Sequence, residues 1–160
     1  MGAMGPGESL LSMTSADYMR HLLPLLNDGR WEFTSEATPE YNCAAWAAGV
    51  TDRIWWPEPE APEYYWPAIR RDGTVEAMIE GFAVVGYLPC DNGDFEPRIE
   101  KLAIYVVGED SPKHVARQLP DGRWTSKIGD LEDIAHTSIQ DVAAGRYGYP
   151  RFFLSRPYVV

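Results

Sequence analysis

The hydrophobic and polar positions of the first half of the chain follow the period of a helix in three places. Residues 15–26 repeat apolar side chains every three or four positions and predict an amphipathic helix with a proline near its end. Residues 42–49 predict a short helix that is apolar all round and therefore buried, and its cap, Asn42, places Cys43 in the first turn. A third helix is expected over residues 74–85.

The second half changes to the pattern of β-strands. Residues 101–107 form an apolar run with β-branched and aromatic members, which predicts a buried central strand. Residues 115–119 and 123–127 flank a Pro-Asp-Gly turn and predict a β-hairpin. The remaining expected elements are two short helices and a final strand, at residues 131–136, 138–144 and 151–154.

This order of elements indicates the fold class. Helices that precede an antiparallel sheet are typical of an α+β domain, here with about four to six strands. We interpret residues 14–160 as a single domain, because no linker or repeat divides them. Residues 1–13, which begin Met-Gly-Ala-Met-Gly, are interpreted as a tag remnant and flexible lead-in.

Charge and cysteine content narrow the class of protein. Fourteen basic and twenty-four acidic residues give a net charge of 14 − 24 = −10, which disfavours nucleic-acid and anionic membrane partners. No apolar run approaches the roughly 18 residues that a membrane helix needs. The two cysteines are expected to be reduced thiols. Without an export signal in this sequence, a cytoplasmic location is expected, although such a signal could have been removed.

The strongest candidate for chemistry is the combination of Cys43 and His114. The first turn of a helix lowers the pKa of a thiol, and a histidine at the start of a strand could accept its proton. A third group would orient the imidazole, and we rank Ser126 and Asp130 ahead of Gln118. The alternative is that Cys43 is a small core residue of an alanine-rich helix.

A resemblance to a known group of proteins supports the thiol hypothesis. Over residues 31–148 the chain resembles an uncharacterised family of small bacterial domains. The resemblance is carried by five motifs, Tyr-Asn-Cys-Ala-Ala-Trp-Ala at 41–47, Trp-Trp-Pro at 55–57, Tyr-Trp-Pro at 65–67, Glu-Lys-Leu-Ala-Ile-Tyr at 100–105 and His-Val-Ala-Arg-Gln-Leu at 114–119 with Gly-Arg-Trp-Thr-Ser-Lys-Ile-Gly at 122–129.

The order of a cysteine-bearing helix and a histidine-led hairpin looks like the papain-like clan, which includes NlpC-type cell-wall amidases. The resemblance implies a papain-like antiparallel sheet packed on the short helix. It also implies that Cys43 is the nucleophile, that His114 is the base and that Ser126 sits at about the third catalytic position. Asp130 is kept as the other candidate for that position.

Two functions from different classes follow. The first is a cysteine hydrolase or acyltransferase that acts on an amide or thioester bond of a peptide, protein or small amide, without a cofactor or metal. The second is a non-catalytic binding or immunity-type module that recognises a protein partner. In either case the aromatic residues wall a cleft or simply pack a long connection. The candidate cleft residues are Asn42, Trp55, Trp56, Trp66, Gln118 and Trp124.

Overall fold

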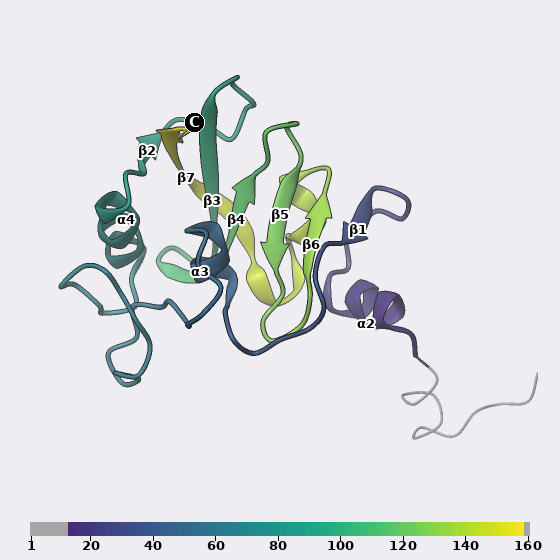
Figure 1. The fold of residues 1–160 in the computed structure, drawn as a ribbon, viewed down its shortest axis with the longest axis horizontal. Helices are drawn as coiled ribbons and strands as arrows, with labels where there is room; N and C mark the ends of the chain where they lie inside the picture. Colours follow the sequence, from purple (N-terminus) through teal and green to yellow (C-terminus); the bar gives the residue numbers. More distant parts are fainter. Residues whose placement is uncertain (1–12, 159–160) are drawn as a thin grey trace, which may run out of the picture.

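One antiparallel sheet of seven strands forms the centre of the protein (Figure 1). The computed structural model describes residues 13–158. The strands follow the spatial order β1-β6-β5-β4-β3-β7-β2, so that the long strand β3 lies between its hairpin partner β4 and the C-terminal strand β7. Their bounds are β1 (Trp31–Phe33), β2 (Leu88–Cys90), β3 (Ile99–Val107), β4 (Ser111–Gln118), β5 (Trp124–Lys127), β6 (Asp133–His136) and β7 (Tyr149–Pro157).

Short helices surround this sheet, which makes the fold mixed α+β, as the sequence predicts. In Figure 1, α3 lies in front of β4, α4 stands beyond the β2 edge and α2 lies near β1. Two single turns of 3₁₀ helix, η1 and η2, precede β7. The bounds are α2 (Ser15–Leu22), α3 (Cys43–Ala47), α4 (Val75–Val84), η1 (Ile139–Val142) and η2 (Gly145–Tyr147).

Each face of the sheet carries its own hydrophobic cluster, because successive side chains of a strand point to opposite faces. On the face of α3 and α4, which we call the front face, Ile104 and Val115 pack with residues of both helices. On the other face, the back face, Tyr105 and Ala116 pack with α2 and the 3₁₀ turns. The front and back faces therefore enclose different side chains of the same strands, and β4 contributes to both.

Two of the predicted helices form other structures. Residues 131–136 are predicted as helical, yet Asp133–His136 is strand β6, which pairs with both β5 and β1. Residues 138–144 form only the 3₁₀ turn η1. The physical reason is that the two neighbouring strands supply backbone partners on both sides of this segment, which outweighs a weak helical pattern of six residues. With β1, β2 and β6 included, the sheet exceeds the expected four to six strands.

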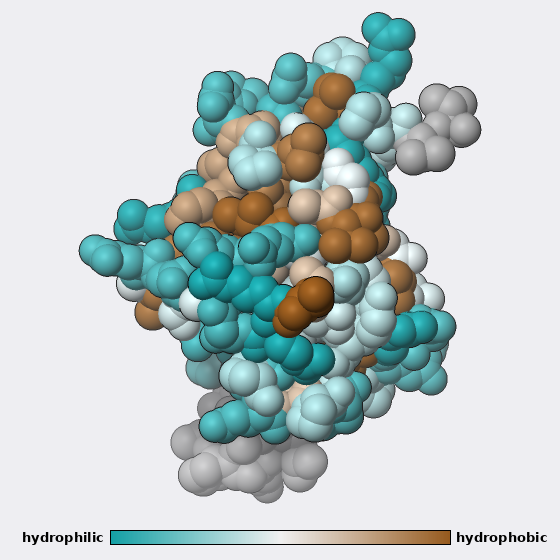
Figure 2. Space-filling view, turned by 90° about the vertical axis from the view of Figure 1, so that its left-hand side faces the viewer, coloured by the Kyte–Doolittle hydropathy of each residue, from teal (hydrophilic) through white to brown (hydrophobic). Residues whose placement is uncertain are grey.

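The segment between α3 and α4, residues 48–74, contains many aromatic residues, and we call it the aromatic connection. It is an ordered coil, as its prolines predict. Trp66 packs from it onto α4 at Gly81, where a side-chain carbon would lie 2.1 Å from the indole ring. A glycine inside α4, which weakens a helix, is therefore explained by the close approach of Trp66. Ile69 of the connection, Val84 of α4 and Leu88 of β2 are large apolar residues that are exposed. Figure 2 shows hydrophobic residues on the surface of the side that is on the left in Figure 1.

Candidate functional site

A pocket of about 330 Å³ opens at the start of α3 and takes its wall from both faces, because Tyr147 of the back cluster lines it together with Cys43 of α3. Its wall comes from the segment before α3, from the aromatic connection, from the start of β4, from the loop after β5 and from η2. The lining residues are Pro39, Tyr41, Asn42, Cys43, Ile54, Trp56, Tyr64, Lys113, Gly129, Asp130, Arg146 and Tyr147. Pockets of this size, with apolar walls and a few polar groups, are typical of small-ligand sites.

Asn42 fixes the geometry of the pocket at the start of α3. Its side-chain oxygen accepts hydrogen bonds from the backbone N–H groups of Ala45 at 3.2 Å and Trp55 at 3.0 Å. Its side-chain amide donates to the carbonyl of Trp55 at 2.8 Å. The predicted cap is confirmed. These three hydrogen bonds join the helix to the aromatic connection and use one of the two amide protons of Asn42.

Cys43 occupies the first position of α3 in the pocket wall, where only 8% of the residue is exposed. Burial raises the pKa of its thiol to about 11, although the backbone N–H groups of Val115 and Ala44 and the charge of Lys127 act in the opposite direction. The sequence predicts a lowered pKa from the position at the helix start. Desolvation outweighs that effect here, and the thiol is protonated at neutral pH.

His114 lies on the back face and is fully buried. Its ring stacks on Tyr147 with centroids 4.2 Å apart and meets the edge of Tyr105. Neither ring nitrogen has a hydrogen-bond partner among residues 13–158, and burial lowers the pKa of His114 to about 3. Because the adjacent Val115 packs on the front face, Cys43 and His114 approach the sheet from opposite sides. The structure forms no hydrogen bond between them.

The two candidates for the third catalytic position are separated as well. The Ser126 hydroxyl bonds Nε2 of His136 at 2.8 Å on the back face, and Nδ1 of that ring contacts the carbonyl of Ser138 at 2.9 Å. A carbonyl only accepts, so Nδ1 carries the proton and Ser126 donates to Nε2. Ser126 thus orients His136, whose pKa burial lowers to about 4. Asp130 is exposed and lines the pocket on the front face.

The candidate cleft residues fall into two groups, those that line the pocket and those that are buried in the core. Trp56 lines the pocket beside Asn42. Trp55 and Trp66 are buried in the front cluster, Trp124 is buried in the back cluster, and Gln118 is buried with its side-chain amide donating to the carbonyl of Gly93. These four residues pack the core and do not line the pocket. The sequence could not separate them, since burial of an aromatic residue depends on the strands and helices that surround it.

The sequence alone assigned no role to Lys127. Lys127 is fully buried on the front face, and Nζ donates to the carbonyls of Thr38 and Gly129 at 2.7 Å each. It also lies 4.8 Å from the ring centre of Tyr41. Burial lowers the pKa of Lys127. This side chain therefore clamps two loops of the pocket, with two of its three N–H groups bonded to loop carbonyls.

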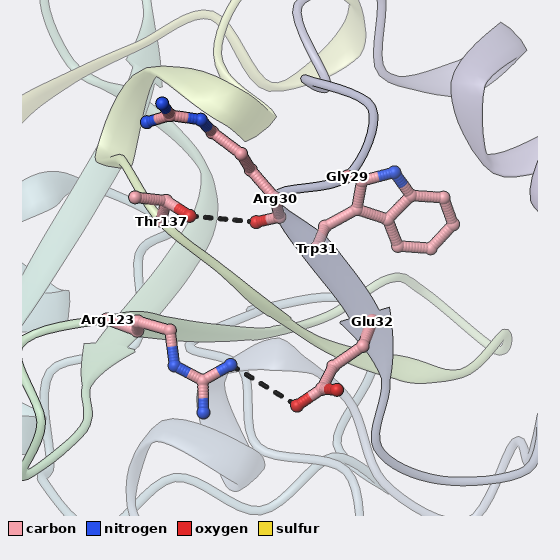
Figure 3. Close-up of a pocket in the computed structure, with 6 residues that line it drawn as sticks. All are labelled: Gly29, Arg30, Trp31, Glu32, Arg123 and Thr137. Atoms are coloured by element: carbon pink, nitrogen blue, oxygen red, sulfur yellow. Dashed lines mark hydrogen bonds and ion pairs between the residues drawn. The ribbon is translucent and has the colours of Figure 1, made fainter.

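A second, smaller pocket of about 290 Å³ lies at β1 (Figure 3). Arg123 lines it and donates to Glu32 across the pocket at 3.2 Å, and it also pairs with Asp121 at 2.9 Å. In Figure 3 the Arg30 guanidinium and the Trp31 indole point away from this ion pair. Arg123 and Glu32 therefore neutralise each other within the protein, whereas Arg30 takes part in none of the ion pairs of residues 13–158. Trp31 is the only aromatic residue of this wall.

Neither a metal cluster nor a membrane-spanning helix is present in the described part of the chain. Residues 13–158 bring no three His, Cys, Asp or Glu side chains together as metal ligands. None of the described helices has the length and apolar character to cross a membrane. Both cysteines are free thiols. Of the predicted lead-in at residues 1–13, residues 1–12 lie outside the described residues.

Comparison with known proteins places the chain in a family without revealing an activity. No curated protein and no solved structure matches the chain. A family model described as a domain of unknown function, DUF7689, matches residues 32–155, which include the whole pocket wall and every strand except part of β1 and the end of β7. The protein therefore belongs to the DUF7689 family of domains of unknown function.

Proposed function

We propose that this protein is a non-catalytic binding domain, of the kind used in immunity-type modules, and that part of its partner occupies the pocket at the start of α3. The observation that carries the proposal is the composition of this wall, in which aromatic side chains stand beside a thiol whose pKa is raised by burial and which forms no hydrogen bond to His114. A catalytic cysteine must either be a thiolate or have a general base within hydrogen-bond reach. His114 lies on the back face, where it neither deprotonates the Cys43 thiol nor forms a hydrogen bond to it.

Rigidity of the wall supports binding without a large rearrangement. Asn42 ties α3 to the aromatic connection through three hydrogen bonds, and Lys127 ties two further loops to β5. Tyr41 donates from its hydroxyl to Asp133 at 2.6 Å, which fixes another ring of the wall. A pocket that is formed before its ligand arrives binds more tightly, because little ordering cost remains.

Protein-observed NMR with a library of small fragments tests the proposal. Fragments should shift the backbone amides of Asn42 and Gly129, with the same affinity in wild type and in Cys43→Ala, because the sulfur performs no chemistry. Ile54→Trp narrows the pocket and should abolish these shifts. Ile69→Trp is the matched control, since Ile69 is fully exposed in the same connection outside this pocket. Hits that persist in Ile54→Trp would overturn the proposal.

A thiol hydrolase or acyltransferase on a papain-like scaffold is the second candidate. Two observations favour it. The first observation is that Cys43 is the first residue of a helix that packs against β4. The second is that Cys43 lies in the pocket wall, with its thiol within reach of the backbone N–H of Val115. In this function Cys43 would attack an amide or thioester carbonyl. His114 would have to reach the thiol from its present position behind the sheet.

The pH dependence of iodoacetamide alkylation separates the two candidates. Binding without catalysis predicts that Cys43 reacts with an apparent pKa well above the ordinary value of about 8.5. The hydrolase predicts a value below about 7, and turnover of fluorogenic peptide amides or acyl thioesters that Cys43→Ala abolishes. Cys90→Ala is the control for the second thiol and should change neither measurement.

A further inference from the structure

The pocket at the start of α3 carries cations that the protein itself leaves without an acid. Lys113 and Arg146 are both exposed and both line the pocket. Among the ion pairs of residues 13–158, none includes either side chain. The only carboxylate in the wall is Asp130, so the lining has a net charge of 2 − 1 = +1 in a chain whose net charge is −10.

Four aromatic side chains also line this pocket. Tyr41, Trp56, Tyr64 and Tyr147 contribute four rings around a volume of about 330 Å³. Such a volume accommodates one large side chain with its adjoining polar group, and not a folded segment. Rings of this kind pack well against another aromatic ring or a branched apolar group. The wall thus combines an apolar compartment with two cationic side chains.

We infer that the ligand of this pocket bears a carboxylate next to an aromatic or branched apolar group, with Lys113 and Arg146 binding the carboxylate. This inference rests on the proposed binding function. Two cations can each donate charge-assisted hydrogen bonds to one carboxylate. A polyphosphate or nucleic acid is disfavoured because the overall negative charge of the protein repels a polyanion.

The pocket at β1 differs because only one of its two cations, Arg30, is outside the ion pairs of residues 13–158. There, Arg123 already pairs with Glu32 and Asp121, so an incoming carboxylate would compete with two acids (Figure 3). At the start of α3, by contrast, an incoming carboxylate would meet two cations that have no partner to give up. The exposed Arg30 beside the β1 pocket is therefore a suitable control position for charge removal.

A matched pair of compounds tests the inference, namely N-acetylphenylalanine and its amide, titrated by NMR. Wild type should bind the acid at least about tenfold more tightly than the amide, since tenfold corresponds to about 1.4 kcal/mol and one charge-assisted hydrogen bond supplies that much. The double variant Lys113→Gln with Arg146→Gln should lose this preference, while Arg30→Gln should keep it. Both substituted side chains are exposed, so folding should be preserved.

Equal affinities for acid and amide would overturn the inference and leave binding in the pocket intact. Absence of binding by both compounds would also overturn the carboxylate inference. The proposed binding function is tested separately, by the NMR fragment screen. A six-residue peptide ending in phenylalanine distinguishes the two sources of such a carboxylate. If the peptide binds more tightly than N-acetylphenylalanine, the natural ligand is the C-terminus of a polypeptide. If the peptide binds more weakly, the ligand is a free aromatic acid. Both results support a ligand with a carboxylate.

Discussion

Acidification from pH 7 to pH 5 should destabilise this protein through its two buried histidines. His114 and His136 have pKa values lowered by burial to about 3 and about 4, against about 6.5 in the unfolded chain. At pH 5 both remain neutral in the folded state, whereas the unfolded chain binds a proton at each. Since the unfolded state binds more protons, the free energy of unfolding falls as the pH falls below about 6.5.

The magnitude follows from proton linkage. For a group with an unfolded pKa of about 6.5 and a folded pKa of 4 or less, lowering the pH from 7 to 5 removes about 2 kcal/mol. His114 and His136 together should therefore cost about 4 kcal/mol, an appreciable part of a typical stability of about 5–15 kcal/mol. The pKa values of Asp17, Asp72 and Asp121 are lowered by hydrogen bonds, so their contribution is lost only below about pH 4.

Urea unfolding followed by tryptophan fluorescence at pH 7, 6 and 5 measures this effect. His114→Phe keeps a ring against Tyr147 and removes one titrating group, so the loss between pH 7 and pH 5 should fall to about half. His21→Gln is the control, because His21 is exposed on α2, and it should leave the full loss in place. A wild-type stability that is flat over this range, or a full loss in His114→Phe, would refute the reasoning.

Three further predictions concern packing and reactivity. Gly81→Ala should lower the free energy of unfolding by about 1–3 kcal/mol, because the added carbon meets the indole that packs on α4, and an unchanged urea midpoint would contradict this. Lys127→Met should cost about 1–3 kcal/mol by removing a buried ammonium that bonds two part-buried carbonyls. The exposed Lys113→Met is its control and should be near neutral in the same urea assay. In folded protein at pH 8, mass spectrometry should find that iodoacetamide labels Cys90 faster than Cys43, because Cys43 is buried with a raised pKa; faster labelling of Cys43 would favour the hydrolase.

Several elements could be predicted from the sequence because their causes are local. Thr14 caps α2 and Asp17 closes the capping box three residues later, as the spacing indicates. Asn42 begins α3 for the same reason. The Pro-Asp-Gly turn joins β4 to β5, since turn chemistry depends on neighbouring residues only. In these cases the hydrogen-bonding partners lie within a few positions of each other.

Tertiary structure alone decided which chemical groups meet. Segment Asp133–His136 is a strand because β5 and β1 flank it, and that pairing directs His136 toward Ser126. His114 sits one position from Val115 in sequence and on the opposite face of the sheet, which takes it away from Cys43. The direction of a side chain depends on strand register, and register is set by partners far away in sequence. The sequence therefore suggested Cys43 and His114 as a candidate catalytic pair, whereas the sheet placed them on opposite sides and assembled a pocket from segments that are distant in sequence.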